Sequence, residues 1–575
     1  MKVPGEKQMS SADVDVHWDV RIPLRDGIHL SALLYRPREP GRQCPAIVTL
    51  TPYVAQTFHD IGLYFAAHGY PFLSVDVRGR GNSEGVFTPC FNEAADGHDV
   101  VEWLAHQPYC NGQVAMWGGS YAGFAQWATA REHPPHLATI VPVASPYAGV
   151  DFPMRNNIPS PDLMQWLTLV AGRTSQDKLF CNNELFWGAR FRRLFELGEP
   201  FQRFDALLGN PSAAFQEWLS HPEPDAYWDS YNPTAEQYAQ ITIPILTITG
   251  TYDDDQPGAL KHYREHLRHA NGDAHERHYL IIGPWDHAGT RTPMPEFVGL
   301  RVGPASLIDL PDLHLQWFAW TMQNGPKPAF LQKSVAYYLM GAEKWRYADS
   351  LDEITSHYIP LYLHSTGNPT DVFHSGSLLE TPSPESEPDH YVYDPRDIGL
   401  AGLECLVDPE SRVDQRMVNA SAGKHLVYHS APFDADLEIS GFFKLSAWIA
   451  IDQPDTDFRA AVYEIDPDGR ALLMTDDRLR ARYRENARKP RLLRSTQPLR
   501  YDFEGFLFSS RLIEKRHRLR LVIGPINSIY SQKNFNSGGV VSKESMSEAR
   551  PVTVRLFHNE QYPSALYVPL GRPES

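Results

Sequence analysis

Ser120 has a clear chemical potential, because it lies in a glycine-rich segment, Trp117–Gly123, that reads WGGSYAG. This segment falls between a predicted strand and a predicted helix, and a serine on such a tight turn is held at the edge of a sheet with its hydroxyl exposed. Small neighbours let the two backbones approach, and Ala122 stands where glycine is usual. The amide of Tyr121 would face the oxygen of a group that the serine attacks. The alternative interpretation is a plain turn with a solvent-facing serine.

A serine hydroxyl attacks a carbonyl only when a base takes its proton and a carboxylate orients that base. In sheets with this kind of turn, the order along the chain is serine, acid, histidine. Asp253 and His287 each come directly after a predicted strand. Because the carboxyl ends of parallel strands meet at one edge of a sheet, these side chains are expected close together. The sequence therefore predicts a catalytic triad of Ser120, His287 and Asp253, with Asp286 as the second choice of acid.

Metal binding is the rival chemistry for the same region. Asp253 begins an Asp-Asp-Asp run, and His262 and His266 are one turn apart on a predicted helix. The acidic run lacks further ligands at the spacing that a cation site needs. The helix with the two histidines carries charges all round, which is typical of a solvent-facing helix. We therefore expect neither a metal ion nor an organic cofactor.

The hydrophobic pattern predicts the elements that position these residues. In residues 1–145, short apolar runs alternate with segments of helical spacing, after an opening hairpin at Arg25-Asp26-Gly27. This alternation predicts a mostly parallel sheet with helices on both faces. The predicted strands are His17–Leu24, Ile28–Tyr35, Pro45–Leu50, Pro71–Val77, Gly112–Trp117 and Leu137–Ala144, and the predicted helices are Phe58–His68, Glu93–His106 and Tyr121–Glu132.

The pattern changes twice further along the chain. Residues 146–240 contain aromatic helical stretches without strand–helix alternation, which predicts a helical insertion. Alternation resumes in residues 241–350. In residues 351–575, short strands separated by Pro, Asp and Gly predict a β-sandwich or jelly roll. The segments behind these predictions are helices Leu163–Val170, Glu184–Leu197, Gly258–Arg268 and Leu307–Asn324, and strands Ile243–Thr249, His278–Ile282, Ile359–His364, His390–Tyr393, Leu437–Ile449, Phe458–Ile465 and Arg518–Ile523.

Composition excludes several classes of protein. With 575 residues, of which 42% are hydrophobic and 21% charged, the chain is an ordinary globular protein of about three domains. Its net charge of −17 is opposite to the basic face of nucleic-acid binders. Apolar runs are shorter than a membrane span needs, and the first residues lack the apolar core of a signal peptide. The five scattered cysteines form no disulfide framework, so we expect a cytoplasmic protein.

Several motifs together resemble a known family over nearly the whole chain. The chain resembles the cocaine-esterase-like serine hydrolases, which are relatives of X-prolyl dipeptidyl aminopeptidases, α-amino-acid ester hydrolases and glutaryl-cephalosporin acylases. The matching pieces are Arg25-Asp26-Gly27, Thr51-Pro52-Tyr53, Asp76-Val77-Arg78-Gly79 with Ser83-x-Gly85, Gly118-Gly119-Ser120-Tyr121, Gly250-Thr251-Tyr252-Asp253, Gly283-Pro284-Trp285-Asp286-His287, Val335–Trp345 and Pro454-Asp455-Thr456-Asp457-Phe458.

The resemblance implies an α/β-hydrolase core, a helical cap inserted after the sixth core strand, and a C-terminal jelly-roll domain. It also implies an oxyanion hole built from the Tyr121 amide and the Tyr53 hydroxyl, because a phenol O–H can donate to a developing alkoxide. Without the resemblance, Tyr53 would be interpreted as a packed aromatic residue in a turn.

The substrate pocket departs from that of the α-amino-acid ester hydrolases, which hold a substrate ammonium with three carboxylates. Asp255 could supply one of them, but Gln256 follows it, and residues 152–157 offer none. An α-amino acyl substrate is therefore disfavoured. Arg155 is a candidate for meeting an acidic group, with a surface arginine as the alternative. Trp166 is a candidate pocket aromatic; it and two other cap aromatics, Trp187 and Phe191, are otherwise explained as ordinary core.

The sequence thus predicts a serine hydrolase that cleaves an ester or amide of a small molecule through an acyl-enzyme. Three alternatives stay open: an acyltransferase that uses the same site, an X-Pro-type exopeptidase, and a binding protein on an inactive hydrolase scaffold. We expect no nucleic-acid or membrane partner, and a homodimer is kept open.

Overall fold

The structure is a computed structural model that describes residues 13–38, 41–174, 183–384 and 386–572. A sheet of ten strands forms its first part, in the order β1-β2-β4-β3-β5-β6-β9-β10-β13-β14. The strands from β4 to β13 run parallel, and antiparallel partners close both edges. The strands are β1 (Val14–Pro23), β2 (His29–Pro37), β3 (Cys44–Thr51), β4 (Phe72–Asp76), β5 (Cys110–Gly119), β6 (Leu137–Val143), β9 (Ile245–Tyr252), β10 (His278–Asp286), β13 (Val335–Leu339) and β14 (Lys344–Ala348).

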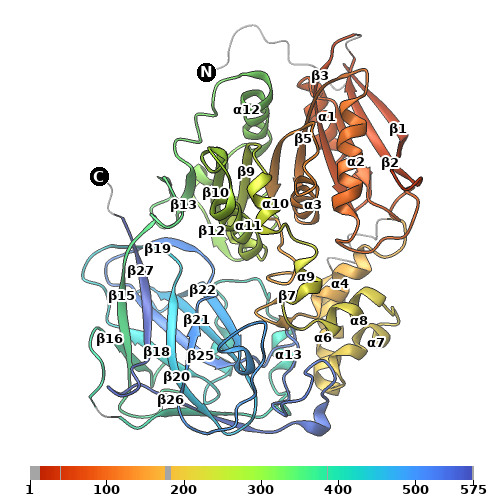
Figure 1. Cartoon of the computed structure of the whole chain (residues 1–575). Helices are drawn as coiled ribbons and strands as arrows, with labels where there is room; N and C mark the ends of the chain where they lie inside the picture. Colours follow the sequence, from red (N-terminus) through yellow and green to blue (C-terminus); the bar gives the residue numbers. More distant parts are fainter. Residues whose placement is uncertain (1–12, 39–40, 175–182, 385, 573–575) are drawn as a thin grey trace.

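Helices cover both faces of this sheet, as the alternating pattern predicts (Figure 1). Alternate residues of the central strands enter two separate cores, because successive side chains of a strand point to opposite faces. Val48 and Met116 pack against α2 and α3, whereas Ile47 and Ala115 pack against α1 and α12. The helices are α1 (His59–Ala67), α2 (Glu93–Ala105), α3 (Tyr121–Ala130), α11 (Gln256–His269) and α12 (Leu310–Gln323).

The chain between β6 and β9, which we call the cap, is mostly helical. It packs an aromatic core that includes Trp187, Phe191 and Trp218. Two strands of two residues each precede the helices, which the sequence pattern did not predict. The elements are β7 (Met154–Arg155), β8 (Ile158–Pro159), α4 (Asp162–Leu169), α6 (Glu184–Leu197), α7 (Phe204–Leu207), α8 (Ala213–Ser220), α9 (Ala226–Asp229) and α10 (Ala235–Gln240).

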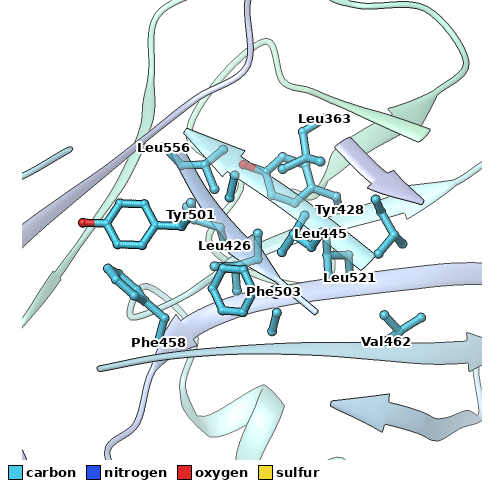
Figure 2. Close-up of a cluster of buried hydrophobic side chains, with 14 of the residues drawn as sticks. Leu363, Leu426, Tyr428, Leu445, Phe458, Val462, Tyr501, Phe503, Leu521 and Leu556 are labelled. Carbon is cyan, nitrogen blue, oxygen red and sulfur yellow. The ribbon is translucent and has the colours of Figure 1, made fainter. Parts of the chain in front are cut away.

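A second large sheet system of thirteen strands, which we call the C-terminal β domain, follows β14. Its interior is filled by large apolar side chains from many strands (Figure 2). Burying one such side chain contributes about 1.5–3 kcal/mol. The strands are β15 (Thr355–His364), β16 (Gly376–Leu379), β17 (Asp389–Tyr393), β18 (Leu426–Ser430), β19 (Leu437–Gly441), β20 (Lys444–Ile451), β21 (Asp457–Ile465), β22 (Ala471–Arg480), β23 (Leu499–Phe503), β24 (Ser509–Ile513), β25 (Arg518–Pro525), β26 (Val552–Phe557) and β27 (Ala565–Gly571).

One strand prediction in this domain was wrong. Leu437–Ile449 forms two strands, β19 and β20, which pair with different neighbours. The chain turns at Gly441, where φ is +137° and a Cβ would lie 2.0 Å from the hydroxyl oxygen of Thr355. Only glycine fits this position, and an apolar pattern cannot show such a turn.

The core strands β9, β10, β13 and β14 follow the cap, and the C-terminal β domain starts at β15. No helix among the described residues is long and apolar enough to cross a lipid bilayer.

Candidate active site

The turn between β5 and α3 holds Ser120 in a backbone conformation that is rare outside glycine. Its φ is +59° and its ψ is −126°. The Ser120 amide donates to the carbonyl of Val143 at 2.9 Å, and its own carbonyl accepts from Gly123 at 2.8 Å and from Phe124 at 3.0 Å. These bonds fix the half-buried serine at the carboxyl end of β5.

Small side chains make this turn possible. A Cβ at Gly118 would lie 2.6 Å from the Cβ of Ala122, and a Cβ at Gly123 would lie 2.9 Å from the carbonyl oxygen of Val143. The strand and the helix therefore cross closely. Glycine is needed at positions 118 and 123, whereas the small methyl group of Ala122 still fits.

Asp253 and His287 meet directly beyond the ends of β9 and β10. The Nδ1 atom of His287 lies 2.8 Å from Oδ1 of Asp253. The Asp253 side chain is fully buried, whereas His287 is 33% exposed. Thr249 donates its hydroxyl to the other carboxylate oxygen of Asp253 at 2.7 Å. The carboxylate is thus held between an imidazole and a hydroxyl, away from water.

The pKa values of the pair move apart. Burial by itself would raise the pKa of Asp253, but the hydrogen bond with His287 and the one from Thr249 outweigh it and hold this pKa below its usual value. Burial would lower the pKa of His287, but the bond to Asp253 outweighs it and raises this pKa. Asp253 is therefore a carboxylate that stabilises the imidazolium form of His287. Asp286, the second choice of acid, instead accepts from the Gly289 amide at 2.7 Å.

Tyr53 follows β3 and its hydroxyl lies at Ser120. The Ser120 side chain lies next to this hydroxyl, and the indole N–H of Trp166 donates to the same hydroxyl at 3.2 Å. Because the indole donates to the phenol oxygen, the Tyr53 hydrogen is left to donate towards the serine. Burial raises the pKa of Tyr53, so it keeps this proton at neutral pH.

The Tyr121 amide is at the first position of α3, where a helix offers no acceptor of its own. The side chain of Tyr121 points the other way: its hydroxyl donates to Glu93 and accepts from the Cys90 amide at 2.8 Å. Its ring stacks on Trp166 at 5.9 Å between centroids.

Burial raises the pKa of Glu93, the partner of the Tyr121 hydroxyl, to about 7. Sequence reasoning missed Glu93, since one acidic residue at a helix start carries no distinctive signal.

Of the remaining candidate pocket residues, Asp255 lies at the site and Arg155 lies away from it. The Oδ2 atom of Asp255 lies 3.8 Å from Nδ1 of His287. Arg155 is instead engaged by the C-terminal β domain, since it donates to the backbone carbonyl of Asp476 at 2.6 Å and to its side chain at 3.3 Å. Arg155 is neither a surface arginine nor unpaired. Gln256 is buried and exchanges hydrogen bonds with the backbone of Phe508, so it joins the Asp253 loop to that domain.

Of the three cap aromatics, only Trp166 is brought to the serine. Trp187 and Phe191 are buried in the cap core. Their helical spacing therefore reflects packing, as the alternative interpretation held.

The expectation that His262 and His266 lie on a solvent-facing helix was wrong. Both are fully buried on the inner face of α11. His262 lies against the Tyr238 hydroxyl at 2.7 Å and the Pro146 carbonyl at 3.2 Å, while His266 contacts His278 at 3.0 Å. Polar partners inside the core let these rings pack there although the rest of the helix is charged. The two nitrogens of His262 are thus engaged by protein atoms rather than directed at a common centre.

A group with metal-ligand spacing lies elsewhere among the described residues. Ligand atoms of Glu102, His106 and His136 lie within 4.8 Å of one another. Glu102 lies near the end of α2, His106 follows that helix and His136 precedes β6, at the opposite end of the strands from Ser120. They are therefore separate from the serine chemistry.

Arg291 is the other residue that sequence reasoning missed. It comes four residues after His287, and its Nη1 atom lies 3.5 Å from Nε2 of that histidine. An arginine in a loop has no sequence signal that separates it from the many surface arginines.

Two known protein families match this chain. Residues 26–289 match the X-Pro dipeptidyl-peptidase (S15 family), and residues 330–566 match the X-Pro dipeptidyl-peptidase C-terminal non-catalytic domain. Together they span most of the sequence, in the order in which the core, cap and β domain occur. The chain therefore carries an S15-type domain followed by the C-terminal domain found with it in X-Pro dipeptidyl-peptidases.

The chain is similar to a protein of known name over nearly its full length. It is 25% identical to the cocaine esterase of Rhodococcus sp. (strain MB1 Bresler), and the match covers 98% of this chain and 100% of the relative. The motif resemblance is therefore confirmed. The chain is an enzyme of the serine hydrolase type.

Two solved structures share the fold. One is an aminopeptidase from a marine sediment archaeon, Thaumarchaeota archaeon, with a TM-score of 0.82 at 22% identity, covering 100% of this chain and 99% of that chain. The other is an α-amino acid ester hydrolase, with a TM-score of 0.82 at 20% identity, covering 99% and 98%. The prediction of an α/β-hydrolase core with a cap and a C-terminal β domain is confirmed.

Proposed function

We propose that this enzyme hydrolyses esters of small molecules through an acyl-enzyme on Ser120, with His287 as base and Asp253 as the orienting acid. The observation that carries the proposal is the 2.8 Å contact between His287 and the buried Asp253, beside the strained serine turn. A buried carboxylate on Nδ1 fixes the tautomer that leaves Nε2 free to accept a proton.

The chemistry follows from these roles. Nε2 of His287 takes the hydroxyl proton of Ser120 while the serine oxygen bonds to the carbonyl carbon. The carbonyl oxygen becomes an alkoxide, which the Tyr53 hydroxyl and the Tyr121 amide stabilise. His287 then passes its proton to the leaving alcohol or amine as the bond to it breaks. Water attacks the acyl-enzyme by the same route, releases the acid and restores the serine.

Ser120 must turn from Tyr53 towards His287 to begin this cycle. In the structure the serine side chain lies beside Tyr53, and Arg291 faces the Nε2 atom of His287. Hydrogen bonds of a catalytic site often tighten only when the substrate is present. Because backbone hydrogen bonds already fix the turn, we expect rotation of the serine side chain to bring its oxygen to Nε2.

Steady-state hydrolysis of a series of p-nitrophenyl esters tests the proposal. We expect turnover by the native protein and a loss of at least about 10⁴-fold in kcat for Ser120→Ala and for His287→Ala. An added amine should leave the free acid as the main product; if the acyl group went mainly to the amine, the acyltransferase alternative would replace the proposal. Turnover that survives in Ser120→Ala would refute it.

An exopeptidase is the second candidate, and Asp255 favours it. Burial raises the pKa of Asp255 well above its usual value, and the neighbouring carboxylates of Asp151 and Asp253 raise it further. Crowded carboxylates of this kind are relieved by a cation, such as a free amino terminus. The test is cleavage of an X-Pro p-nitroanilide compared with its N-acetylated form. Preference for the free amine that disappears in Asp255→Asn would support this candidate.

We also propose a cytoplasmic location and keep the four-part division at residues 145, 240 and 350. The location is supported by four cysteines that are free thiols, Cys44, Cys90, Cys110 and Cys405; Cys181 lies outside the described residues. Cell fractionation tests the location, limited proteolysis tests the division, and light scattering tests whether the protein forms a homodimer.

A further inference from the structure

Arg291 lies directly beside the reacting groups. Its Nη1 atom is 3.5 Å from Nε2 of His287. Its side chain packs flat on Gly119, the residue before Ser120, because a Cβ there would lie 2.9 Å from Cδ and 3.0 Å from Nη1 of Arg291. The guanidinium is also close enough to the Tyr53 hydroxyl to lower its pKa. Arg291 therefore borders the space in which the substrate carbonyl must sit.

This guanidinium is half-buried and has no carboxylate partner among the described residues, since its contact with His287 is its one side-chain polar contact there. A cation partly removed from water is costly unless an anion or several acceptors compensate. Arginines in such positions usually meet a carboxylate with two parallel hydrogen bonds. Asp255 contacts the opposite ring edge of His287, at Nδ1.

We propose that Arg291 forms a subsite for a carboxylate of the substrate, so that the enzyme selects esters or amides that carry a carboxylate near the scissile bond. This inference rests on the function proposed above and names its substrate class. The planar guanidinium suits a carboxylate, which it can bind with two N–H groups while its stem stays on Gly119.

Binding at this subsite also frees the base. In the structure an N–H of Arg291 faces Nε2 of His287, the atom that must accept the Ser120 proton. A carboxylate on Arg291 draws this N–H away and leaves Nε2 to the serine. The subsite therefore affects kcat as well as KM.

Three matched esters test the proposal. They are p-nitrophenyl hexanoate, which is neutral, p-nitrophenyl monoadipate, with a carboxylate on the acyl chain, and the hexanoate ester of 4-hydroxybenzoate, with a carboxylate on the leaving group. Comparing Arg291→Gln with the native protein cancels the different intrinsic reactivities. In Arg291→Gln, we expect kcat/KM for one of the two charged esters to fall about 10–100-fold more than kcat/KM for the neutral ester. Arg291→Lys should restore part of the difference.

The controls separate this inference from the proposed function. Arg301→Gln changes an exposed arginine of the same loop region and should leave all three rates unchanged. Hydrolysis of the neutral ester, and its loss in Ser120→Ala, tests the proposed ester hydrolysis independently of the Arg291 subsite. Calorimetric titration with adipate reads the subsite without turnover, and binding should be lost in Arg291→Gln. Equal losses for all three esters, or adipate binding that Arg291→Gln does not weaken, would overturn the proposal.

Discussion

At the scale of single residues, the site depends on a few donors and one buried carboxylate. Tyr53 supplies a phenol O–H at Ser120, and Trp166 orients it by donating to its oxygen. Asp253 supplies the charge that makes His287 a stronger base. Each role predicts a different kinetic signature.

Tyr53→Phe removes one oxyanion donor and keeps the ring. We expect kcat for ester hydrolysis to fall by about 10²–10³-fold with little change in KM, because the donor acts on the charge that develops in the transition state. Tyr391→Phe is the matched control, since the buried Tyr391 hydroxyl of the C-terminal β domain has no hydrogen-bond partner among the described residues. An unchanged kcat in Tyr53→Phe would remove this tyrosine from the oxyanion hole.

Asp253→Asn tests the acid through the pH profile. Hydrolysis needs neutral His287, so activity is present above the pKa of His287 and is lost as the pH falls through it. Asp253 raises that pKa; the acid limb of kcat/KM should therefore lie above about 6.5 in the native protein. In Asp253→Asn the imidazolium loses its partner, so the limb should move to lower pH and the rate should drop by about 10⁴-fold.

The neighbouring acid serves as the control for this profile. Asp286→Asn should keep the native acid limb, because Asp286 caps the Gly289 amide rather than His287. A limb that moves in Asp286→Asn and stays in Asp253→Asn would reverse the assignment of the acid.

At the scale of elements, the crossing of β5 and α3 determines where the nucleophile stands. Gly118 has a positive φ and lies against Ala122, so the turn has no room for a side chain. The order strand, serine turn, helix could be predicted from the sequence, because apolar periodicity and glycine spacing report it directly. The buried face of α11 could not, since the charges of that helix hide the polar partners that hold His262 and His266 inside.

Gly118→Ala tests this crossing. The added methyl group would overlap Ala122, so we expect a loss of about 1–3 kcal/mol in the free energy of unfolding and a larger relative loss of kcat. Gly69→Ala is the control, because Gly69 also has a positive φ, +92°, but has open space around its Cβ position. Urea unfolding and ester hydrolysis measure the two effects. Equal losses in both variants would show that backbone strain, rather than the crossing, matters.

At the scale of the whole molecule, the site lies where core, cap and C-terminal β domain meet. Trp166 links the cap to Tyr53, Gln256 links the Asp253 loop to Phe508, and Arg155 links the cap to Asp476. The three parts were predictable from the sequence, because strand–helix alternation gives way first to helical stretches and later to short strands. Their contacts were not, because a salt bridge between residues 321 positions apart leaves no pattern in one sequence. This is why Arg155 was a candidate pocket residue, whereas Arg291 was missed because a loop arginine carries no distinguishing signal.

Arg155→Met tests the link between the cap and the β domain. Asp476 is nearly buried and, among the described residues, keeps Arg459 alone as an ion-pair partner in this variant. We therefore expect the first unfolding transition to lose about 1–3 kcal/mol. Arg488→Met removes an exposed pair with Asp229 across the same parts and should cost about 0–1 kcal/mol. A specific rise in KM without destabilisation would instead return Arg155 to the substrate pocket.

The central claim is that Ser120 is an activated nucleophile, and labelling with a fluorophosphonate tests it most directly. Intact-mass measurement and peptide mapping of the native protein should give one adduct, located on Ser120, and Ser120→Ala should give none. An absent adduct, or an adduct on another residue, would contradict the triad and favour a binding protein on an inactive hydrolase scaffold.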